Sequence, residues 1–440
     1  MSHSTNRRHF LQTTAATGIG FWVAGGVRAQ ESKSPNETIA IASIGVGGKG
    51  SSDSSDAGSS GDMVAICDID EGILNNAGEK RFPNAKRYTD FRKLLDEMGK
   101  SIDAVTVSTA DHTHAPAALM AMRMGKHCFC QKPLTHSIYE ARLMAQVAKE
   151  KNLVTQMGNQ GTAASSLRKA AAIVKSGVLG PVKEVHVWTN RPVWPQGGDR
   201  PKPVDCPPHI KWDLWLGPAA ERPYANGYHP FAWRGFWDFG TGALGDMACH
   251  TVNMPYMALN LRDPIAVQAE CSGHNKETYP KWSTIDFDFP ALGDRPAVKL
   301  FWYDGGKRPN EALLEGKPME ASGCLVIGEK AKLYGPSDYC EKELYVLGAD
   351  VPEVKWTESP GHFAEWVEGI KGGEMPMSNF PNYAGGLTET ILLGNLAVWV
   401  AASGKGEKVE WDAKNMRSTN IPGLELIVKP NYRPGYTLDV

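Results

Sequence analysis

The chain has 440 residues, and its 47 lysines and arginines against 49 aspartates and glutamates give a formal net charge of −2 at pH 7. A single hydrophobic core stops growing at about 250 to 300 residues, so this length predicts two domains. The charge is balanced, and the sequence has no basic run or basic patch interleaved with aromatic residues, which argues against a nucleic-acid-binding protein.

The first 29 residues have the pattern of an export signal rather than that of a folded domain. The twin arginine Arg7-Arg8 precedes the apolar pair Phe10-Leu11, and a moderately hydrophobic run continues from Thr13 to Val27. Val27-Arg28-Ala29 then fits a small-x-small cleavage site. The pattern predicts a Tat signal peptide over residues 1–29, export by the Tat machinery, and a periplasmic mature protein that does not span the membrane. An uncleaved N-terminal anchor is the alternative.

Eight cysteines are spread along the chain without the spacing of a disulfide framework. No C-x-x-C pair occurs, which argues against a structural zinc site. Export permits one or two disulfides, but buried free thiols are the expectation for so few cysteines in a chain of this length.

A glycine-rich turn at residues 45–50 is the first candidate binding site. The apolar stretch Ile39–Ile44 predicts a buried strand, and it is followed by Gly45-Val46-Gly47-Gly48-Lys49-Gly50. Glycines at this G-x-G-x-x-G spacing allow a tight strand-to-helix turn and close approach of a pyrophosphate, whose charge is met by backbone N–H groups. The turn therefore predicts a dinucleotide site that includes Gly45, Gly47, Gly48, Lys49 and Gly50.

The next predicted strand supports this interpretation. Met63–Cys67 is apolar and ends in Asp68, whose carboxylate is placed to accept both ribose hydroxyls of the adenosine half. This carboxylate repels a 2′-phosphate and no arginine follows in residues 69–72, so NAD is favoured over NADP as the cofactor. Residues 51–60 form helices poorly, and we expect a short helix or a partly irregular turn there. A solvated serine loop between two ordinary strands stays open as the alternative.

Helical and strand-like segments alternate after Asp68, which is typical of a doubly wound parallel sheet. Ligands of such sheets bind beyond the carboxyl ends of the strands, where residues 110–115 and Gln131-Lys132-Pro133 are expected. We expect helices at 91–98, capped by Thr89 or Asp90, at 116–124 and at 133–151, and strands at 104–109, 127–130 and 153–157.

The second half of the chain predicts a larger sheet. The alternating pattern of residues 182–189 is typical of a strand with one buried and one wetted face. Residues 422–440 are expected to run extended along the body of the protein or along a neighbouring subunit. We expect further strands at 298–303, 323–328 and 332–335, and helices at 165–176, 362–370 and 385–400.

Aromatic residues gather after a proline-rich loop at residues 192–208, which is placed to arch over a site. Four tryptophans lie between residues 212 and 237, beside Tyr228, His229 and Phe231. Such density suits a platform on which the apolar faces of sugars stack. A hydrophobic core or an oligomer interface explains it equally well, and the sequence leaves both interpretations open.

A second glycine-rich turn, at residues 240–245, opens a predicted helix that carries Asp246 and His250. These two residues are i and i+4, so both project from one face of the helix. A carboxylate beside an imidazole fixes its tautomer and raises its basicity, as a general base needs. A purely structural Asp–His pair is one alternative. A metal site shared with His112 and His114 is another, but no H-x-x-x-H or H-E-x-x-H pattern supports it and no metal is expected.

Together these motifs resemble the Gfo/Idh/MocA oxidoreductases. The shared features are the glycine turn, Asp68, the Thr-x-x-x-x-His run from Thr109 to His114, Lys132-Pro133, and Asp246-x-x-x-His250, all in family order. The resemblance covers essentially the whole mature chain. Two positions depart from the family pattern, since Gln131 stands where the family usually has glutamate and Ala110 where it often has proline.

The resemblance implies an α/β chain with a Rossmann domain at residues 36–158 and a substrate-binding and oligomerisation domain at residues 159–440. The second domain is expected to contain a large, open, mostly antiparallel sheet, and the protein to form a homodimer or homotetramer that acts on a carbohydrate. The implied catalytic residues are Lys132, Asp246 and His250. In addition to the glycine turn and Asp68, the residues implied to bind the cofactor are Thr109, His114, Lys132 and Asn159. The residues implied to bind the substrate are Tyr228, His229, Trp237 and His250.

In the implied reaction, His250 takes the proton of a sugar hydroxyl while the carbon gives hydride to nicotinamide. Lys132 stabilises the negative charge that develops on the oxygen, and Asp246 orients His250. Gln131 in place of glutamate leaves Lys132 without its usual carboxylate neighbour, which makes the position of Lys132 an open question.

Three functions fit the sequence. Export favours a sugar oxidoreductase with tightly bound NAD that is recycled in place, because no nicotinamide pool is expected outside the inner membrane. The first alternative is an NAD-assisted, redox-neutral enzyme that cleaves glycosides. The second is a non-catalytic, nucleotide-dependent sugar-binding protein, against which the presence of Lys132, Asp246 and His250 together argues.

Overall fold

The computed structural model describes residues 38–438. The predicted signal peptide at residues 1–29 lies outside these residues and stays a prediction. Within the described part of the chain, no helix is both long and apolar enough to cross a membrane. The division into domains at 36–158 and 159–440 also stays a prediction, since the described residues 38–438 belong to one compact unit.

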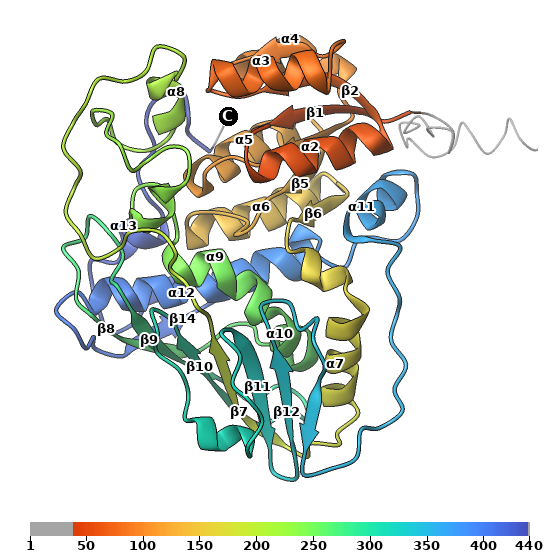
Figure 1. Cartoon of the computed structure of the whole chain (residues 1–440), viewed down its shortest axis with the longest axis vertical. Helices are drawn as coiled ribbons and strands as arrows, with labels where there is room; N and C mark the ends of the chain where they lie inside the picture. The colour runs from red at the N-terminus through yellow and green to blue at the C-terminus, as the bar shows by residue number, and fades with distance from the viewer. Residues whose placement is uncertain (1–37, 439–440) are drawn as a thin grey trace, which may run out of the picture. The chain divides into compact units, whose positions relative to one another are not determined.

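The first half of this unit contains a parallel sheet of six strands in the order β3-β2-β1-β4-β5-β6 (Figure 1). This confirms the expected doubly wound sheet, because the strand order reverses between β1 and β4, where such sheets bind their ligands. The strands are β1 (Ala40–Ile44), β2 (Asp62–Cys67), β3 (Lys86–Tyr88), β4 (Ala104–Val107), β5 (His127–Cys130) and β6 (Thr155–Met157).

Helices cover both faces of this sheet. Alternate residues of β1 point to opposite faces, so that Ile41 packs with the residues of α2 and α3, whereas Ala42 and Ile44 pack with those of α4, α5 and α6. A helix from far along the chain, α11 (His362–Ile370), adds Trp366 to the first of these faces. The other helices are α2 (Lys49–Ser60), α3 (Glu71–Lys80), α4 (Phe91–Met98), α5 (Asp111–Arg123) and α6 (Ile138–Glu150).

Two of these helices begin at other residues than expected. The helix predicted at 116–124 begins at Asp111, so Pro116 lies inside it, where proline has no N–H to donate to the carbonyl one turn earlier. The helix predicted at 133–151 begins only at Ile138. Ser137 and Glu140 form a capping box that ends the preceding loop, so Lys132 lies in a loop rather than beside a helix start.

Of the expectations for residues 51–60, the helix is confirmed, whereas the irregular turn and the serine loop were wrong, since these residues form most of the regular twelve-residue helix α2. Serine hydroxyls donate to carbonyls one turn earlier, for example Ser55 to Ser51 and Ser59 to Ser55, at 2.8 and 2.9 Å. The guanidinium of Arg81 also donates to the carbonyl of Ser51 at 2.7 Å. Tertiary contacts and the burial of Ala57 therefore outweigh the low helix propensity of serine.

The second half contains a sheet of nine strands in the order β13-β12-β11-β7-β10-β9-β8-β14-β15. Only β7 (Val182–Trp188) and β10 (Val298–Tyr303) pair in parallel among the described strands of this sheet, which confirms the expected mostly antiparallel arrangement. The remaining strands are β8 (Ala266–Cys271), β9 (Ser283–Phe289), β11 (Gly323–Gly328), β12 (Lys332–Pro336), β13 (Tyr345–Leu347), β14 (Val409–Asp412) and β15 (Arg417–Ser418).

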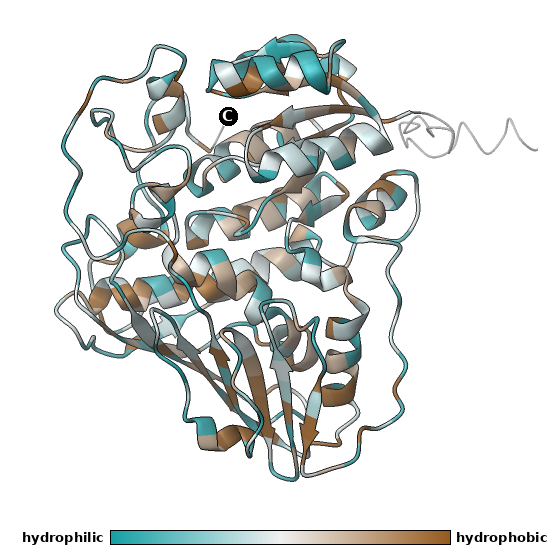
Figure 2. Ribbon diagram, in the orientation of Figure 1, coloured by the Kyte–Doolittle hydropathy of each residue, from teal (hydrophilic) through white to brown (hydrophobic). Residues whose placement is uncertain are grey.

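Helix α12 (Gly385–Val400) connects the two sheets. Twelve of its sixteen residues are buried, and Figure 2 shows brown, apolar residues along much of its length. It contacts α6 of the first half as well as α9 (Gly242–Thr251) and β8 of the second. The remaining helices are α7 (Ser165–Lys175), α8 (Trp212–Leu216), α10 (Asn253–Leu259) and α13 (Glu425–Val428).

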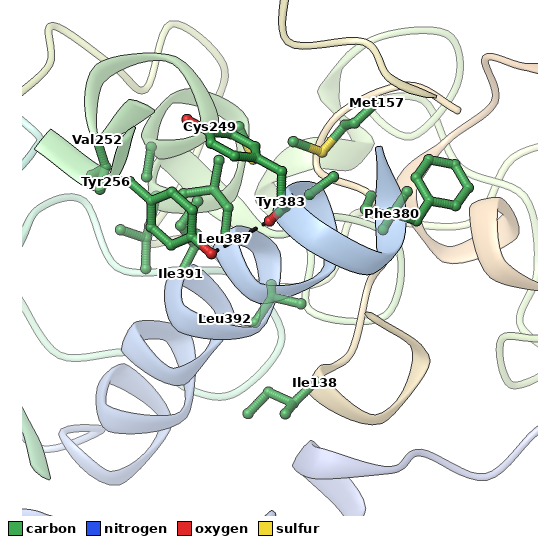
Figure 3. Close-up of a cluster of buried hydrophobic side chains, with 14 of the residues drawn as sticks. Ile138, Met157, Cys249, Val252, Tyr256, Phe380, Tyr383, Leu387, Ile391 and Leu392 are labelled. Carbon is green, nitrogen blue, oxygen red and sulfur yellow. Dashed lines mark hydrogen bonds between the residues drawn. The ribbon is translucent and has the colours of Figure 1, made fainter. Parts of the chain in front are cut away.

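The core around α12 is continuous across both halves. Figure 3 shows Leu387 and Ile391 of α12 beside Tyr256 of α10, with Ile138 of α6 and Met157 of β6 in the same cluster. Since α9 packs on the same helix, this core fixes Asp246 and His250 relative to the strand ends of the first sheet.

Candidate functional site

The candidate site is a cavity of about 560 Å³ that is lined by both halves of the chain. It runs from the glycine turn after β1 to the residues on α9 that the sequence singles out. The first half contributes Gly45, Gly47, Gly48, Lys49, Asp68, Thr109 and Lys132, among others. The second half contributes Arg191, Trp194, His229, Phe231, Trp233, Arg234, Asp246, His250 and Tyr339, and the C-terminal tail adds Tyr436.

The glycines of the turn are required by close backbone contacts. Gly45 has a φ of +83°, and a Cβ atom there would lie 2.4 Å from the carbonyl oxygen of Ser108. A Cβ atom on Gly50 would lie 2.2 Å from the carbonyl oxygen of Gly45. Gly50 does not line the cavity, so its function is to let α2 start directly behind the turn. The backbone N–H groups at the start of α2 therefore face the cavity, where they suit a pyrophosphate.

Asp68 lies at the carboxyl end of β2 and lines the cavity next to the turn. Its two carboxylate oxygens accept hydrogen bonds from the backbone N–H groups of Val46, at 3.0 Å, and Asp70, at 3.1 Å. Burial raises the pKa of Asp68, and these two bonds partly oppose that shift. The turn, the start of α2 and this carboxylate together fit the pyrophosphate and ribose of NAD.

Behind the turn, Asp53 of α2 forms the centre of a buried polar network that the sequence analysis did not identify. Its carboxylate pairs with Lys49 at 2.6 Å and accepts hydrogen bonds from Ser108 at 2.7 Å and Gln131 at 2.8 Å. The side-chain oxygen of Gln131 accepts a bond from the backbone N–H of Lys132 at 3.2 Å. The amide at position 131 thus matches Asp53, because a glutamate there would place two carboxylates together.

The other expected cofactor residues occupy different positions. Thr109 lines the cavity, whereas His114 and Asn159 lie buried behind its wall. The ring nitrogens of His114 lie 2.9 Å from the backbone oxygen of Pro133 and 3.1 Å from that of Thr109, and a neutral ring donates a hydrogen bond to one of the two. Burial lowers the pKa of His114 to about 4, so this ring is neutral. His114 therefore joins the two loops that carry Thr109 and Lys132.

Lys132 and Asp246 meet across the cavity. The ammonium of Lys132 donates to Oδ1 of Asp246 at 2.8 Å and to its backbone oxygen at 2.9 Å. The guanidinium nitrogens Nε of Arg234 and Arg191 lie 3.5 and 3.9 Å from the same carboxylate. Burial by itself raises the pKa of Asp246, but Lys132 and Arg234 reverse this and hold the pKa below its usual value. Asp246 is therefore ionised at neutral pH.

His250 follows one turn later on α9 and lines the same cavity. The expected hydrogen bond between Asp246 and His250 is absent among the described contacts, because the carboxylate of Asp246 binds Lys132 instead. Nδ1 of His250 is buried without a hydrogen-bond partner among the described residues, and the ring of Tyr339 packs edge-on at 4.7 Å. Burial and the charge of Lys132 hold the pKa of His250 well below 6.5, so its imidazole is neutral.

The aromatic region divides into two sets. His229, Phe231, Trp233 and Trp194 line the cavity. Tyr228 and Trp237, which were expected to bind substrate, do not line it. Tyr228 is 1% exposed and packs in an aromatic core, while Trp237 stacks on Tyr279 at 3.8 Å. The core interpretation is therefore confirmed for Tyr228 and Trp237, while the sugar-stacking platform stays a prediction for the rings that line the cavity.

The C-terminal tail completes the cavity wall beside Asp90 and Phe91. Its Tyr436 lies under the guanidinium of Arg92, 4.2 Å from the ring centroid, and Arg92 also donates to the carbonyl of Gly435 at 3.3 Å. Tyr432 anchors the tail by donating to Glu140 at 2.9 Å. The tail packs along the body as expected, but its contribution to the cavity had no signal in the sequence.

The cysteines and acidic residues suggest no other centre. All eight cysteines are free, and seven of them are buried. Among residues 38–438, no group of three or more histidine, cysteine, aspartate or glutamate side chains is arranged to hold a metal ion.

Comparison with known proteins identifies the family. A family model described as an oxidoreductase family with an NAD-binding Rossmann fold matches residues 39–159. A second model, described as the C-terminal α/β domain of the oxidoreductase family, matches residues 161–334, and both models carry the Gfo/Idh/MocA name. The chain belongs to the Gfo/Idh/MocA oxidoreductase family. Its first half is thus an NAD-binding Rossmann domain, which agrees with the fit of the turn and Asp68.

Two relatives within the curated proteins are dehydrogenases. Levoglucosan dehydrogenase of Pseudarthrobacter phenanthrenivorans is 26% identical over 176 residues, which are 40% of this chain and 37% of that protein. Inositol 2-dehydrogenase of Salmonella typhimurium is 28% identical over 127 residues, which are 28% of this chain and 37% of that protein. Each match spans little more than a third of the length of the relative.

Solved dehydrogenase structures share the fold. The WlbA dehydrogenase from Bordetella pertussis, in complex with NADH and UDP-GlcNAcA, has a TM-score of 0.59 and 16% identity, covering 86% of this chain and 99% of that one. An inositol dehydrogenase homologue from Azotobacter vinelandii, in complex with NADH and myo-inositol, has a TM-score of 0.57 and 17% identity. The match covers 86% of this chain and 98% of that one.

The network around Asp53 gives a first prediction. Gln131→Glu places a second carboxylate beside Asp53, and we expect it to lower the free energy of unfolding at pH 7.5 by about 1 to 3 kcal/mol. The loss shrinks at lower pH, where one of the two carboxyl groups takes up a proton. Denaturant unfolding followed by tryptophan fluorescence measures both effects.

The matched control exchanges the two groups. The double variant Asp53→Asn, Gln131→Glu again holds one carboxylate and one amide, so it is expected to recover most of the lost stability. A single variant as stable as the wild type, or a double variant no better than the single, contradicts this account of Gln131.

Proposed function

We propose that the protein transfers a hydride between the hydroxyl-bearing carbon of a sugar or glycoside and a tightly bound NAD cofactor. The observation that carries this proposal is the single cavity that joins the glycine turn and Asp68 to Lys132, Asp246 and His250. The similarity to levoglucosan and inositol dehydrogenases supports a carbohydrate or polyol as the substrate.

NAD, when bound, supplies the hydride chemistry, and the residues of this chain handle the proton and the charge. His250 is neutral and lines the cavity, so its imidazole can accept the proton of the substrate hydroxyl. Lys132 uses two donated hydrogen bonds on Asp246, and an ammonium has three donors. The third is available to the substrate oxygen, where it stabilises developing negative charge.

Asp246 has a different role in this mechanism from the one the sequence suggested. Its carboxylate and its backbone oxygen hold the ammonium of Lys132 in place. It therefore positions Lys132 rather than His250. This also answers how Lys132 is placed without a glutamate at position 131, since the partner comes from α9 of the other half of the chain.

Cofactor retention fits the predicted export. The Tat pattern at residues 1–29 supports a periplasmic location, where a cofactor must travel bound and be recycled in place. The anchored tail with Tyr436 in the cavity wall supports slow release. We include a homodimer or homotetramer in the proposal, because the large second sheet offers a face for a neighbouring subunit.

Lys132→Met tests the central proposal. We expect a fall in turnover of about a hundredfold or more with NAD still bound, because the variant loses the charge that stabilises the oxyanion. Reduction of the bound NAD by added sugar is followed by absorbance, and a chromogenic glycoside tests the redox-neutral alternative. Aglycone release without net NADH would favour cleavage over oxidation.

Lys408→Met is the matched control, since Lys408 is an exposed lysine paired with Asp288 on the second sheet. It is expected to keep wild-type turnover. Turnover of Lys132→Met equal to that of this control rules out the assigned role of Lys132.

The low pKa of His250 predicts the pH dependence. A lowered pKa keeps the imidazole in its proton-accepting form well below pH 6.5. The kcat/KM for oxidation is therefore expected to show no fall as the pH is lowered from 8 to about 6.5. The loss of activity begins only at lower pH. Initial rates at each pH, with recovery checked after return to pH 7.5, measure the profile, and an acidic limb between pH 7 and 8 contradicts it.

Tyr436 provides a test of cofactor retention. Tyr436→Ala removes part of the cavity wall, and we expect NADH to dissociate about tenfold faster. Tyr436→Phe keeps the ring and removes a hydroxyl that is buried without a partner among the described residues, so its dissociation rate should stay close to that of the wild type. Stopped-flow capture of released NADH by a second dehydrogenase gives both rates, and equal rates for all three proteins contradict the role of the tail.

A further inference from the structure

The end of the cavity beside His250 carries an excess of positive charge. Lys132, Arg234 and Arg191 approach the single carboxylate of Asp246 at 2.8, 3.5 and 3.9 Å. Their side chains are 17%, 23% and 25% exposed, so none of the three charges is fully solvated. Three cations thus face one carboxylate within ion-pair distance, which leaves the two guanidiniums only partly balanced.

The two arginines have no second carboxylate. Among the described residues, Asp246 is the only acidic side chain within ion-pair distance of either guanidinium. Arg234 donates one hydrogen bond, to the carbonyl of Phe231 at 3.1 Å, and Arg191 donates one to Asn190. Asp111 also lines the cavity, but it accepts the hydroxyl of Thr241 at 2.6 Å and lies beyond ion-pair distance of all three cations.

Three other partly buried arginines of this protein are balanced by carboxylates, whereas Arg81 and Arg295 donate only to carbonyl and hydroxyl oxygens among the described contacts. Arg222 pairs with both Asp238 and Glu277, Arg168 pairs with Glu365, and Arg142 with Glu389. An unbalanced pair of guanidiniums in a site of low dielectric is unfavourable unless a further anion arrives. The pyrophosphate of the cofactor does not serve this purpose, because the glycine turn and the start of α2 provide its site.

The guanidiniums are also held in place for recognition. Arg234 packs over the ring of Trp233, 4.2 Å from its centroid, and over Phe231 at 5.0 Å. Both aromatic rings line the cavity with Arg191 and Arg234. A planar guanidinium fork binds a carboxylate through two parallel hydrogen bonds, and aromatic faces beside it suit the apolar face of a sugar ring.

We infer that the substrate is a sugar acid whose carboxylate binds Arg191 and Arg234 while its reacting hydroxyl faces Lys132 and His250. This inference rests on the proposed function, since it names the substrate class of the same site. The carboxylate supplies the missing negative charge, and it fixes which carbon of the ring lies next to the hydride acceptor.

The test compares matched sugars in two readouts. D-glucuronate and D-galacturonate are paired with D-glucose and D-galactose, and each is assayed for NADH formation and for binding to the NAD-loaded protein by tryptophan fluorescence. We expect the wild type to prefer the acid of each pair by at least about tenfold. Arg191→Gln and Arg234→Gln should each reduce the acid-to-neutral ratio by about tenfold to a hundredfold, and added salt should reduce it as well.

Two further variants control for charge and folding. Arg417→Gln removes an exposed arginine on β15 and should leave the ratio unchanged. Arg234→Lys keeps the charge but loses the planar fork, and it should give an intermediate ratio. If the glutamine variants do not fold, the lysine variant and the salt dependence of the wild type still decide the question.

Each outcome separates the two proposals. Arginine-dependent binding of the acids without oxidation supports the sugar-acid site and contradicts hydride transfer. Oxidation of the neutral sugars with no preference for the acids overturns the sugar-acid site and leaves hydride transfer standing. A preference for glucose 6-phosphate over both acids, or no binding of any acid, also overturns it.

Discussion

The site depends on the contact between the ammonium of Lys132 and the carboxylate of Asp246. The lysine follows β5 of the Rossmann sheet and the aspartate lies on α9, so the bond joins the two halves of the chain across the cavity. It occupies the carboxylate that the neighbouring histidine would otherwise bind. His250 thereby remains neutral and unpartnered among the described residues, as a proton acceptor requires.

The bond forms because the core places its partners. Helix α12 is mostly buried and packs against both α6 and α9, so neither half can shift without opening a hydrophobic contact. The Asp53 network fixes the other partner, because Gln131 holds the backbone N–H of Lys132. The hydrophobic core around α12 thus positions Asp246, and the polar network around Asp53 positions Lys132.

The sequence predicted the features that depend on local spacing. The glycine turn, Asp68 after β2 and the i, i+4 positions of Asp246 and His250 follow from short patterns with a direct geometric meaning. The pairing of Asp53 with Gln131 and the gathering of Arg191 and Arg234 around Asp246 could not be predicted, because these residues lie far apart in the chain. Aromatic content likewise could not separate buried Tyr228 from cavity-lining Trp233, since both occur in one irregular segment.

The position of α11 has a consequence for how the chain folds. Trp366 packs against Phe129, with the ring centroids 5.9 Å apart, and donates to the carbonyl of Val154 at 3.3 Å, so the Rossmann sheet needs a helix from more than 200 residues later to cover one face. An isolated fragment that ends after β6 would expose this face to water. Contacts of such long sequence separation slow folding, because the intervening chain must be closed into a loop first. The nucleotide-binding half is therefore expected to acquire its native core late in folding, together with the other half.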